Sequence, residues 1–197
     1  MASELFVDKI TGKTGTSGSA PLSMSGNTLT ATLGTSSTGF GLTTHVDQWR
    51  VESDTTTEGI LTNVGQVGTD SFSQIGTAMT ESSGYFTFPT TGIYDVSMMG
   101  MMRQLNNSNA WCGVQGKATT NNSSYNIAFE CYQQIVQASG SSNQYVNFYG
   151  HCILDVTNTS NVKFKVSFFA DQNEQVYLHG GGSYNQTALK FTRLGDT

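Results

Sequence analysis

Three histidines and three cysteines are the residues of this chain best suited to acid–base or nucleophilic chemistry. His45, His151 and His179 are far apart in the sequence, and strand alternation places His151 on the face opposite Cys152. A histidine satisfied at the surface or in an interface is therefore the better interpretation of His151, with a pocket histidine as the alternative. No catalytic use of the histidines is predicted.

The cysteines Cys112, Cys131 and Cys152 are spaced about twenty residues apart. Zinc sites typically contain close Cys-x-x-Cys pairs, which this spacing lacks. An odd number of cysteines also leaves one thiol unpaired if the other two join. In a reducing compartment, the simplest interpretation is three buried thiols that act as small apolar residues. A metal site is the less favoured alternative.

Other sequence patterns that could support catalysis or ligand binding are incomplete. No Gly-x-Ser-x-Gly elbow marks a hydrolase nucleophile. The run Gly180–Gly182 lacks the Lys-Ser/Thr of a phosphate-binding loop and is predicted to be a wide loop between strands. The carboxylates Asp47, Glu52, Asp54 and Glu58 cluster loosely without the spacing of a calcium loop. The sequence therefore predicts no enzyme, no cofactor and no metal site.

The bulk composition indicates a packed β-protein. Hydrophobic residues make up 37% of the 197 residues and charged residues only 12%, while Asn, Gln, Ser, Thr and Gly fill the difference. Aromatic residues reach 11%, which is too many for a disordered chain and typical of strands. This length suits one ordinary domain with a modest extension.

Charge and hydropathy exclude two classes of partner. The net charge is −5, and no patch gathers the nine basic residues, so nucleic-acid binding is not expected. No apolar run approaches the ~20 residues that span a bilayer, so membrane insertion is not expected either. The amino-terminal run MASELFVDKI does not read as a secretory signal. We therefore expect synthesis and folding in the cytoplasm.

The central stretch Gly84–Val96 holds two short β-patterned runs that meet at a proline. Phe86 and Phe88 share one face, and Pro89 to Gly92 is predicted to be a turn because proline lacks the N–H that a central strand needs. Alternating runs continue to the carboxyl end and indicate eight to ten antiparallel strands in two sheets. The predicted core residues are Trp49, Phe86, Phe88, Tyr94, Val96, Phe164, Val166, Phe168 and Phe191.

Two further predictions concern less regular segments. Residues 71–79 are predicted to be a loop or short strand anchored by Phe72 and Ile75. The methionines between Met98 and Met102 are predicted to fill an irregular part of the core, and an adaptable binding surface is the weaker alternative.

Three motifs carry a resemblance to a known family. The string GYFTFPTTGIYDV, with its aromatic doublet followed by Pro-x-x-Gly-x-Tyr, resembles the complement-q globular head, a subgroup of the TNF-like jelly rolls. Together with Asp47-Gln48-Trp49-Arg50 and the ending FTRLGDT from Phe191, it is similar to structural proteins of marine tailed-phage (cyanophage-like) virions. The resemblance spans residues 47–197 and implies an all-β, two-sheet antiparallel jelly-roll sandwich that assembles as a homotrimer.

The amino-terminal part has a different composition. Residues 1–43 are rich in Ser, Thr and Gly but carry apolar residues at strand-like spacing, which favours an arm that docks on a partner over a flexible linker. We expect the arm to attach the protein to a virion, with Leu5, Val7 and Ile10 as the anchor, and residues 44–197 to form the jelly roll.

Several tyrosines fall on the polar phase of their strands, which suits an interface. The candidates for a trimer or partner interface are Tyr125, Tyr145, Tyr149 and Tyr177. Tyrosine also suits sugar binding, and the sequence does not separate the two uses.

The functional expectation is a non-enzymatic phage virion structural protein. It is expected to be a trimeric capsid decoration (cement) protein on the particle surface that contacts the major capsid protein. The alternative is a tail-fibre or adsorption protein that recognises a host-surface glycan. These 197 residues contain neither a heptad run nor a long repeat shaft of the kind that projects a fibre head, which favours decoration.

Overall fold

The computed structural model describes residues 22–25, 28–31, 43–68, 74–105, 110–136, 143–171 and 176–197. The chain divides into two compact units, Met1–Gly41 and Leu42–Thr197. The first unit contains an antiparallel pair of strands, β1 (Leu22–Ser25) and β2 (Thr28–Ala31). The predicted anchor residues Leu5, Val7 and Ile10 lie outside the described residues.

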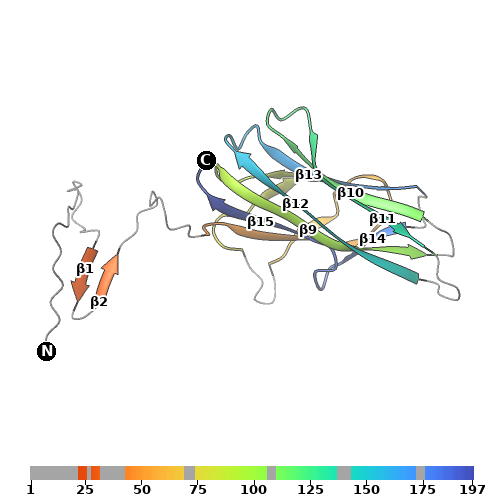
Figure 1. Cartoon of the computed structure of the whole chain (residues 1–197), viewed down its shortest axis with the longest axis horizontal. Helices are drawn as coiled ribbons and strands as arrows, with labels where there is room; N and C mark the ends of the chain where they lie inside the picture. The colour runs from red at the N-terminus through yellow and green to blue at the C-terminus, as the bar shows by residue number, and fades with distance from the viewer. Residues whose placement is uncertain are drawn as a thin grey trace. The chain divides into compact units, whose positions relative to one another are not determined.

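The second unit contains two antiparallel sheets, and the first of them is built on the long strand β9 (Gly92–Leu105). Strand β12 (Asn143–Val156) pairs with β9 along its whole length at one edge. At the other edge β9 pairs with β15 (Ala188–Gly195) and then with β14 (Val176–Gly181) (Figure 1). Three shorter strands complete this β9 sheet: β3 (Val46–Val51), β4 (Ser53–Thr55) and β6 (Val64–Gln66).

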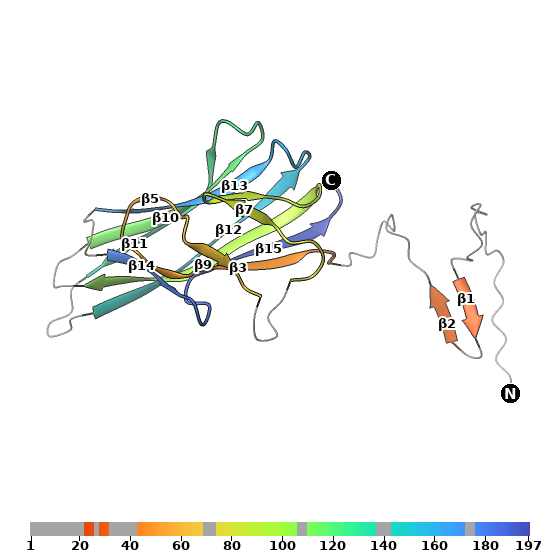
Figure 2. The same ribbon diagram turned by 180° about the vertical axis from the view of Figure 1, so that it is seen from behind.

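The second sheet, called the β13 sheet, has the strand order β11-β10-β13-β8-β7, with β5 also paired to β13 (Figure 2). Its strands are β5 (Gly59–Ile60), β7 (Thr80–Ser82), β8 (Tyr85–Thr87), β10 (Ala110–Thr119), β11 (Asn126–Ile135) and β13 (Lys163–Ala170). Neighbouring strands are often distant in sequence, as in a jelly roll. The fold is therefore an all-β, two-sheet antiparallel jelly-roll sandwich, as the sequence predicts, and the described residues contain no helix.

The core lies between the two sheets, where alternate side chains of each strand meet. All nine predicted core residues are buried. Phe191 of β15 contacts rings from the opposite sheet, with ring centroids 5.1 Å from Phe86 and 6.0 Å from Phe164. Trp49 of β3 packs edge-on against Phe86 at 5.3 Å. These aromatic contacts join the carboxyl-terminal strand to the central stretch.

The turn after β8 is fixed by its own side chains. The Tyr94 hydroxyl donates to the carbonyl of Thr90 at 3.0 Å and lies 3.1 Å from the Thr90 hydroxyl. Gly92 has a φ of 143°, and a Cβ there would lie 2.5 Å from the carbonyl oxygen of Gly195. Glycine is needed here because both the dihedral angle and the space exclude a side chain.

Two predictions for the less regular segments differ from the structure, and the predicted anchor Phe72 lies outside the described residues. Ile75 is more than half exposed, so its prediction as an anchor was wrong. Its backbone instead exchanges two hydrogen bonds with Val46, and among residues 74–79, the part that is described, Met79 is the buried one. Gly180 and Gly181 belong to β14 and do not form a wide loop. A Cβ on Gly180 would lie 2.4 Å from the Ser53 carbonyl oxygen, so glycine permits close approach of β4.

The methionines of β9 split between core and surface. Met98 and Met102 are fully buried, whereas Met99 is exposed, because successive side chains of a strand point to opposite faces. The prediction of a core role therefore holds for Met98 and Met102 and was wrong for Met99.

Candidate functional site: the outer face of the β9 sheet

The outer face of the β9 sheet exposes four large apolar side chains. Tyr145, Tyr149 and Ile153 lie four residues apart on one face of β12, and Met99 lies directly opposite Tyr149 on β9. These four side chains are 49 to 63% exposed. Four large apolar side chains exposed on one sheet face make this face a candidate interaction surface.

A shallow pocket of about 180 Å³ adjoins this surface, between Tyr149 and Met99 on one side and Asn185 and Lys190 on the other. The Asn185 Oδ1 atom is buried and lacks a hydrogen-bond partner among the described residues. The pocket therefore combines apolar side chains with a lysine.

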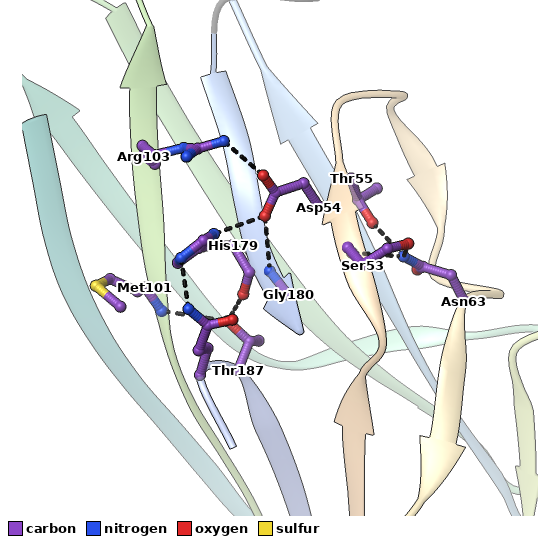
Figure 3. Close-up of polar contacts among 10 residues, drawn as sticks. Ser53, Asp54, Thr55, Asn63, Met101, Arg103, His179, Gly180 and Thr187 are labelled. Carbon is purple, nitrogen blue, oxygen red and sulfur yellow. Dashed lines mark hydrogen bonds and ion pairs between the residues drawn. The ribbon is translucent and has the colours of Figure 1, made fainter. Parts of the chain in front are cut away.

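Next to the apolar group, Asp54 of β4 holds three hydrogen-bond donors (Figure 3). The Arg103 guanidinium donates to Asp54 Oδ2 at 2.5 Å, and His179 Nδ1 donates to Oδ1 at 2.6 Å. The backbone N–H of Gly180 donates to the same Oδ1 at 3.0 Å. Asp54 thus links its own strand to β9 and β14.

The surroundings of this cluster are also ordered by contacts. The Arg103 guanidinium lies 5.1 Å from the centre of the Tyr177 ring, and the His179 ring lies 5.9 Å from that of Tyr145. The Gln186 amide nitrogen lies 2.6 Å from His179 Nε2. The Thr187 hydroxyl donates to the His179 carbonyl at 2.6 Å. Both ring nitrogens of His179 therefore contact protein groups, Nδ1 the Asp54 carboxylate and Nε2 the Gln186 amide.

An Asp–His pair can orient an imidazole as a general base for a neighbouring nucleophile. Such a nucleophile would have to face Nε2 of His179, and that atom contacts the Gln186 amide. Among the described residues, no hydroxyl or thiol is hydrogen-bonded to it. The cluster therefore supports a structural role, in which Arg103 balances the charge of Asp54 at the strand edges.

Two of the other carboxylates that cluster in the sequence, Asp47 and Glu58, also have structural roles. Asp47 is 3% exposed, and its two oxygens accept four hydrogen bonds. Glu58 accepts a hydrogen bond from the backbone N–H of Ala170 at 2.7 Å. No group of three or more His, Cys, Asp and Glu residues in the described ranges could hold a metal ion.

The three cysteines are free thiols that differ in burial. Burial raises the pKa of Cys112 to about 12 and that of Cys152 to about 11. Cys112 is fully buried, with its Sγ 3.1 Å from the sulfur of Met102. Cys131 is half-buried, donates to the Tyr149 carbonyl, and has its pKa raised, first by burial and then by Glu130. The thiols are therefore weak nucleophiles at neutral pH.

Three of the four predicted interface tyrosines lie on this sheet face. Tyr145, Tyr149 and Tyr177 come from β12 and β14, on opposite sides of β9. Tyr125 lies beside the other sheet, where the Lys165 ammonium sits 4.1 Å from the centre of its ring. The candidate surface therefore includes the first three tyrosines and not Tyr125. His151 is exposed beside Tyr149, with ring centroids 5.7 Å apart.

Sequence reasoning missed several residues of the molecule's surface. Met99 was assigned to the core with its neighbours, and the pairing of Asp54 with His179 joins residues 125 positions apart. A second exposed aromatic group, formed by Trp111, Tyr132 and Phe169 on the β13 sheet, was also missed. The alternation that places Cys112 and Val114 in the core puts Trp111 outside, so the sequence did contain a signal for it.

Comparison with models of protein families and with curated proteins gives no match. Comparison with solved structures gives a clear one: the chain is similar to the Eiger TNF of S. frugiperda, with a TM-score of 0.54. The alignment covers 77% of this chain and 93% of that one at 11% sequence identity. The fold is therefore TNF-like. The described residues include no helix long and apolar enough to cross a membrane.

Proposed function

We propose that this protein is a non-enzymatic structural protein that assembles as a homotrimer through the outer face of the β9 sheet. The observation that carries the proposal is the exposed group of Tyr145, Tyr149, Ile153 and Met99 on that face. Burying these side chains against further copies removes apolar area from water, which is the main favourable term in association. Closed cyclic symmetry would use the same surfaces on each copy and leave none of them open.

The proposal extends to a role in a tailed-phage virion, as a capsid decoration protein that contacts the major capsid protein. Its support is the motif resemblance at Asp47–Arg50, Thr80–Val96 and Phe191–Thr197, together with the TNF-like fold. The Ser/Thr/Gly-rich arm of residues 1–43 would attach each copy to the particle.

The trimer is tested by light scattering on the purified chain, which should give about three times 21.2 kDa. The variant Ile153→Lys places a charge in the proposed interface and should give a monomer. Ile127→Lys is a matched control, because Ile127 is 54% exposed against 55% for Ile153 but lies in β11 of the other sheet. A parent protein that is monomeric at micromolar concentration would contradict the proposal.

A second candidate function is adsorption to a host-surface glycan, as part of a tail fibre. The observation that favours it is the exposed aromatic group on the β13 sheet, which lies apart from the proposed trimer surface. Phage adsorption assays separate this candidate from decoration.

A further inference from the structure

Three aromatic side chains form an exposed patch on the outer face of the β13 sheet. Trp111 comes from β10, Tyr132 from β11 and Phe169 from β13, and these three strands lie side by side (Figure 1). The ring centroids are 6.1 Å apart for Trp111 and Tyr132, 5.9 Å for Trp111 and Phe169, and 4.9 Å for Tyr132 and Phe169. Trp111 is 44% exposed and Tyr132 57% exposed. This group is called the aromatic patch below.

The backbone beneath the patch is adapted to hold the rings in place. Gly113 of β10 pairs with Tyr132 on one side and with Phe169 on the other. A Cβ on Gly113 would lie 2.3 Å from the Phe169 ring. Glycine therefore lets Phe169 lie flat over β10 and contact Tyr132. The patch is preorganised, because its rings are packed against one another before any partner arrives.

Polar side chains border the rings and are themselves ordered. Two residues from Gly113 on the same face, Gln115 pairs with Glu130 and donates to its carboxylate. A hydrogen bond with Glu130 also raises the pKa of Tyr132. At the other end, Asp171 accepts a hydrogen bond from the Trp111 backbone N–H at 3.1 Å. The patch thus has apolar faces in the middle and amide and carboxylate acceptors around them.

The size of the patch fits a small ligand better than a protein. Trp111 and Tyr132 are about half exposed and Phe169 is partly buried, so the three rings together offer less than roughly 300 Å² of surface. A stable protein interface needs about 800 Å² from each partner.

The charge around the patch excludes anionic ligands. The charged side chains beside it in the described strands are Glu130 and Asp171, both acidic. Lys117 and Lys165 pair with each other four residues away from the Gly113–Phe169 pair, and Lys165 contacts the rings of Tyr85 and Tyr125. Nucleic acid, phosphate and acidic sugars would therefore meet repulsion here.

We propose that the Trp111–Tyr132–Phe169 patch is a binding platform for an uncharged saccharide. The C–H face of a sugar ring is apolar and stacks on the electron-rich face of an aromatic ring. The hydroxyls at the edge of the same sugar ring donate to the carboxylates of Glu130 and Asp171 and to the amide oxygen of Gln115. The patch lies on the sheet opposite the proposed trimer surface, so this inference stands independently of the trimer.

Affinity electrophoresis of the full chain through gels that contain a soluble polysaccharide tests the platform. The probes are four neutral polymers (a β-glucan, a galactan, a mannan and a xylan) and one anionic polymer, alginate. We expect at least one neutral polymer to retard the parent protein and alginate to leave its migration unchanged. Trp111→Ala should weaken the retardation at least about tenfold, and Trp111→Phe should keep most of it because a ring remains.

Two controls keep the test specific. Tyr184→Ala removes an aromatic side chain outside the patch that is even more exposed than Trp111, and this variant should bind as the parent does. Thermal melting and light scattering should show that Trp111→Ala is folded and has the parent's mass. Failure of all four neutral polymers, preference for alginate, or an unchanged Trp111→Ala variant would overturn the proposal. A change of mass in Trp111→Ala would instead make the patch a contact between copies of the chain.

Discussion

At the scale of single residues, Asp47 explains why the run Asp-Gln-Trp-Arg matters to the fold. Its Oδ2 accepts hydrogen bonds from the Trp49 indole at 2.9 Å and from the Met79 backbone N–H at 2.8 Å. Its Oδ1 accepts from Gln66 at 2.9 Å and from the backbone N–H of Gln48 at 3.0 Å. One buried carboxylate thus fixes the rotamer of a core tryptophan and ties β3 to β6 and to the segment before β7.

Replacing Asp47 with alanine should therefore lower the free energy of unfolding by about 3 kcal/mol or more. The physical reason is that the Trp49 indole and the Met79 N–H remain buried without an acceptor, and each such group costs about 1–3 kcal/mol. Urea unfolding followed by tryptophan fluorescence measures the change. Glu52→Ala is the control, because Glu52 is an exposed carboxylate in the same region and should change stability little. Equal stabilities for the two variants would show that Asp47 does not organise this region.

The buried thiols predict a loss of stability in alkaline solution. Burial raises the pKa of Cys112 to about 12 from the ordinary value of 9.0, so the folded state keeps this thiol neutral while the unfolded state ionises. This contribution is fully present below pH 9 and is lost as the pH rises from 9 towards 12. Urea midpoints at pH 7.5 and 10.5 should therefore fall less for Cys112→Ala than for the parent. An equal fall of the urea midpoint in the parent and in Cys112→Ala would contradict a buried thiol that stays neutral in the folded state.

At the scale of strands, the sequence predicts the orientation of side chains best where one face of the strand is buried and the other is exposed to solvent. Phe164, Val166 and Phe168 of β13 alternate with polar residues, so their phase could be read directly. In β9 the alternation could be read as far as Met98, but the methionines on both sides of Gly100 are all apolar and were assigned to the core together. The exposed side of β9 became visible only through its pairing with β12, which places Met99 opposite Tyr149.

The candidate sites follow the same physical division. Tyr145, Tyr149 and Tyr177 could be proposed from sequence because each occupies the polar phase of its strand. Their grouping depends on the order β12-β9-β14, which joins segments distant in sequence. The Asp54–His179 pair and the Trp111–Tyr132–Phe169 patch could not be derived, because each needs contacts between strands that no local pattern specifies.

At the scale of the whole molecule, the two units differ in composition, and the proposed function gives them different roles. Residues 42–197 bury a continuous aromatic core and form a compact unit. Residues 1–41 form a separate unit whose Ser, Thr and Gly content offers little apolar surface to bury. Under the proposed function, the sandwich supplies self-association and the arm supplies attachment to the particle.

The decoration and adsorption hypotheses predict different defects in phage particles that lack the protein: reduced particle stability or reduced adsorption to cells. If the protein decorates the capsid, phage that lack it should adsorb to cells normally but lose infectivity faster on heating or in low salt, because the shell subunits are no longer clamped.

Adding back the full chain should restore the stability of these particles. A chain that begins after residue 40 should fold and trimerise but fail to rebind, since the arm makes the attachment. Plaque counts after heating and the amount of protein that co-sediments with particles measure both effects. Particles of normal stability that no longer adsorb would contradict decoration and favour the fibre, and full rebinding by the truncated chain would assign the attachment to the sandwich.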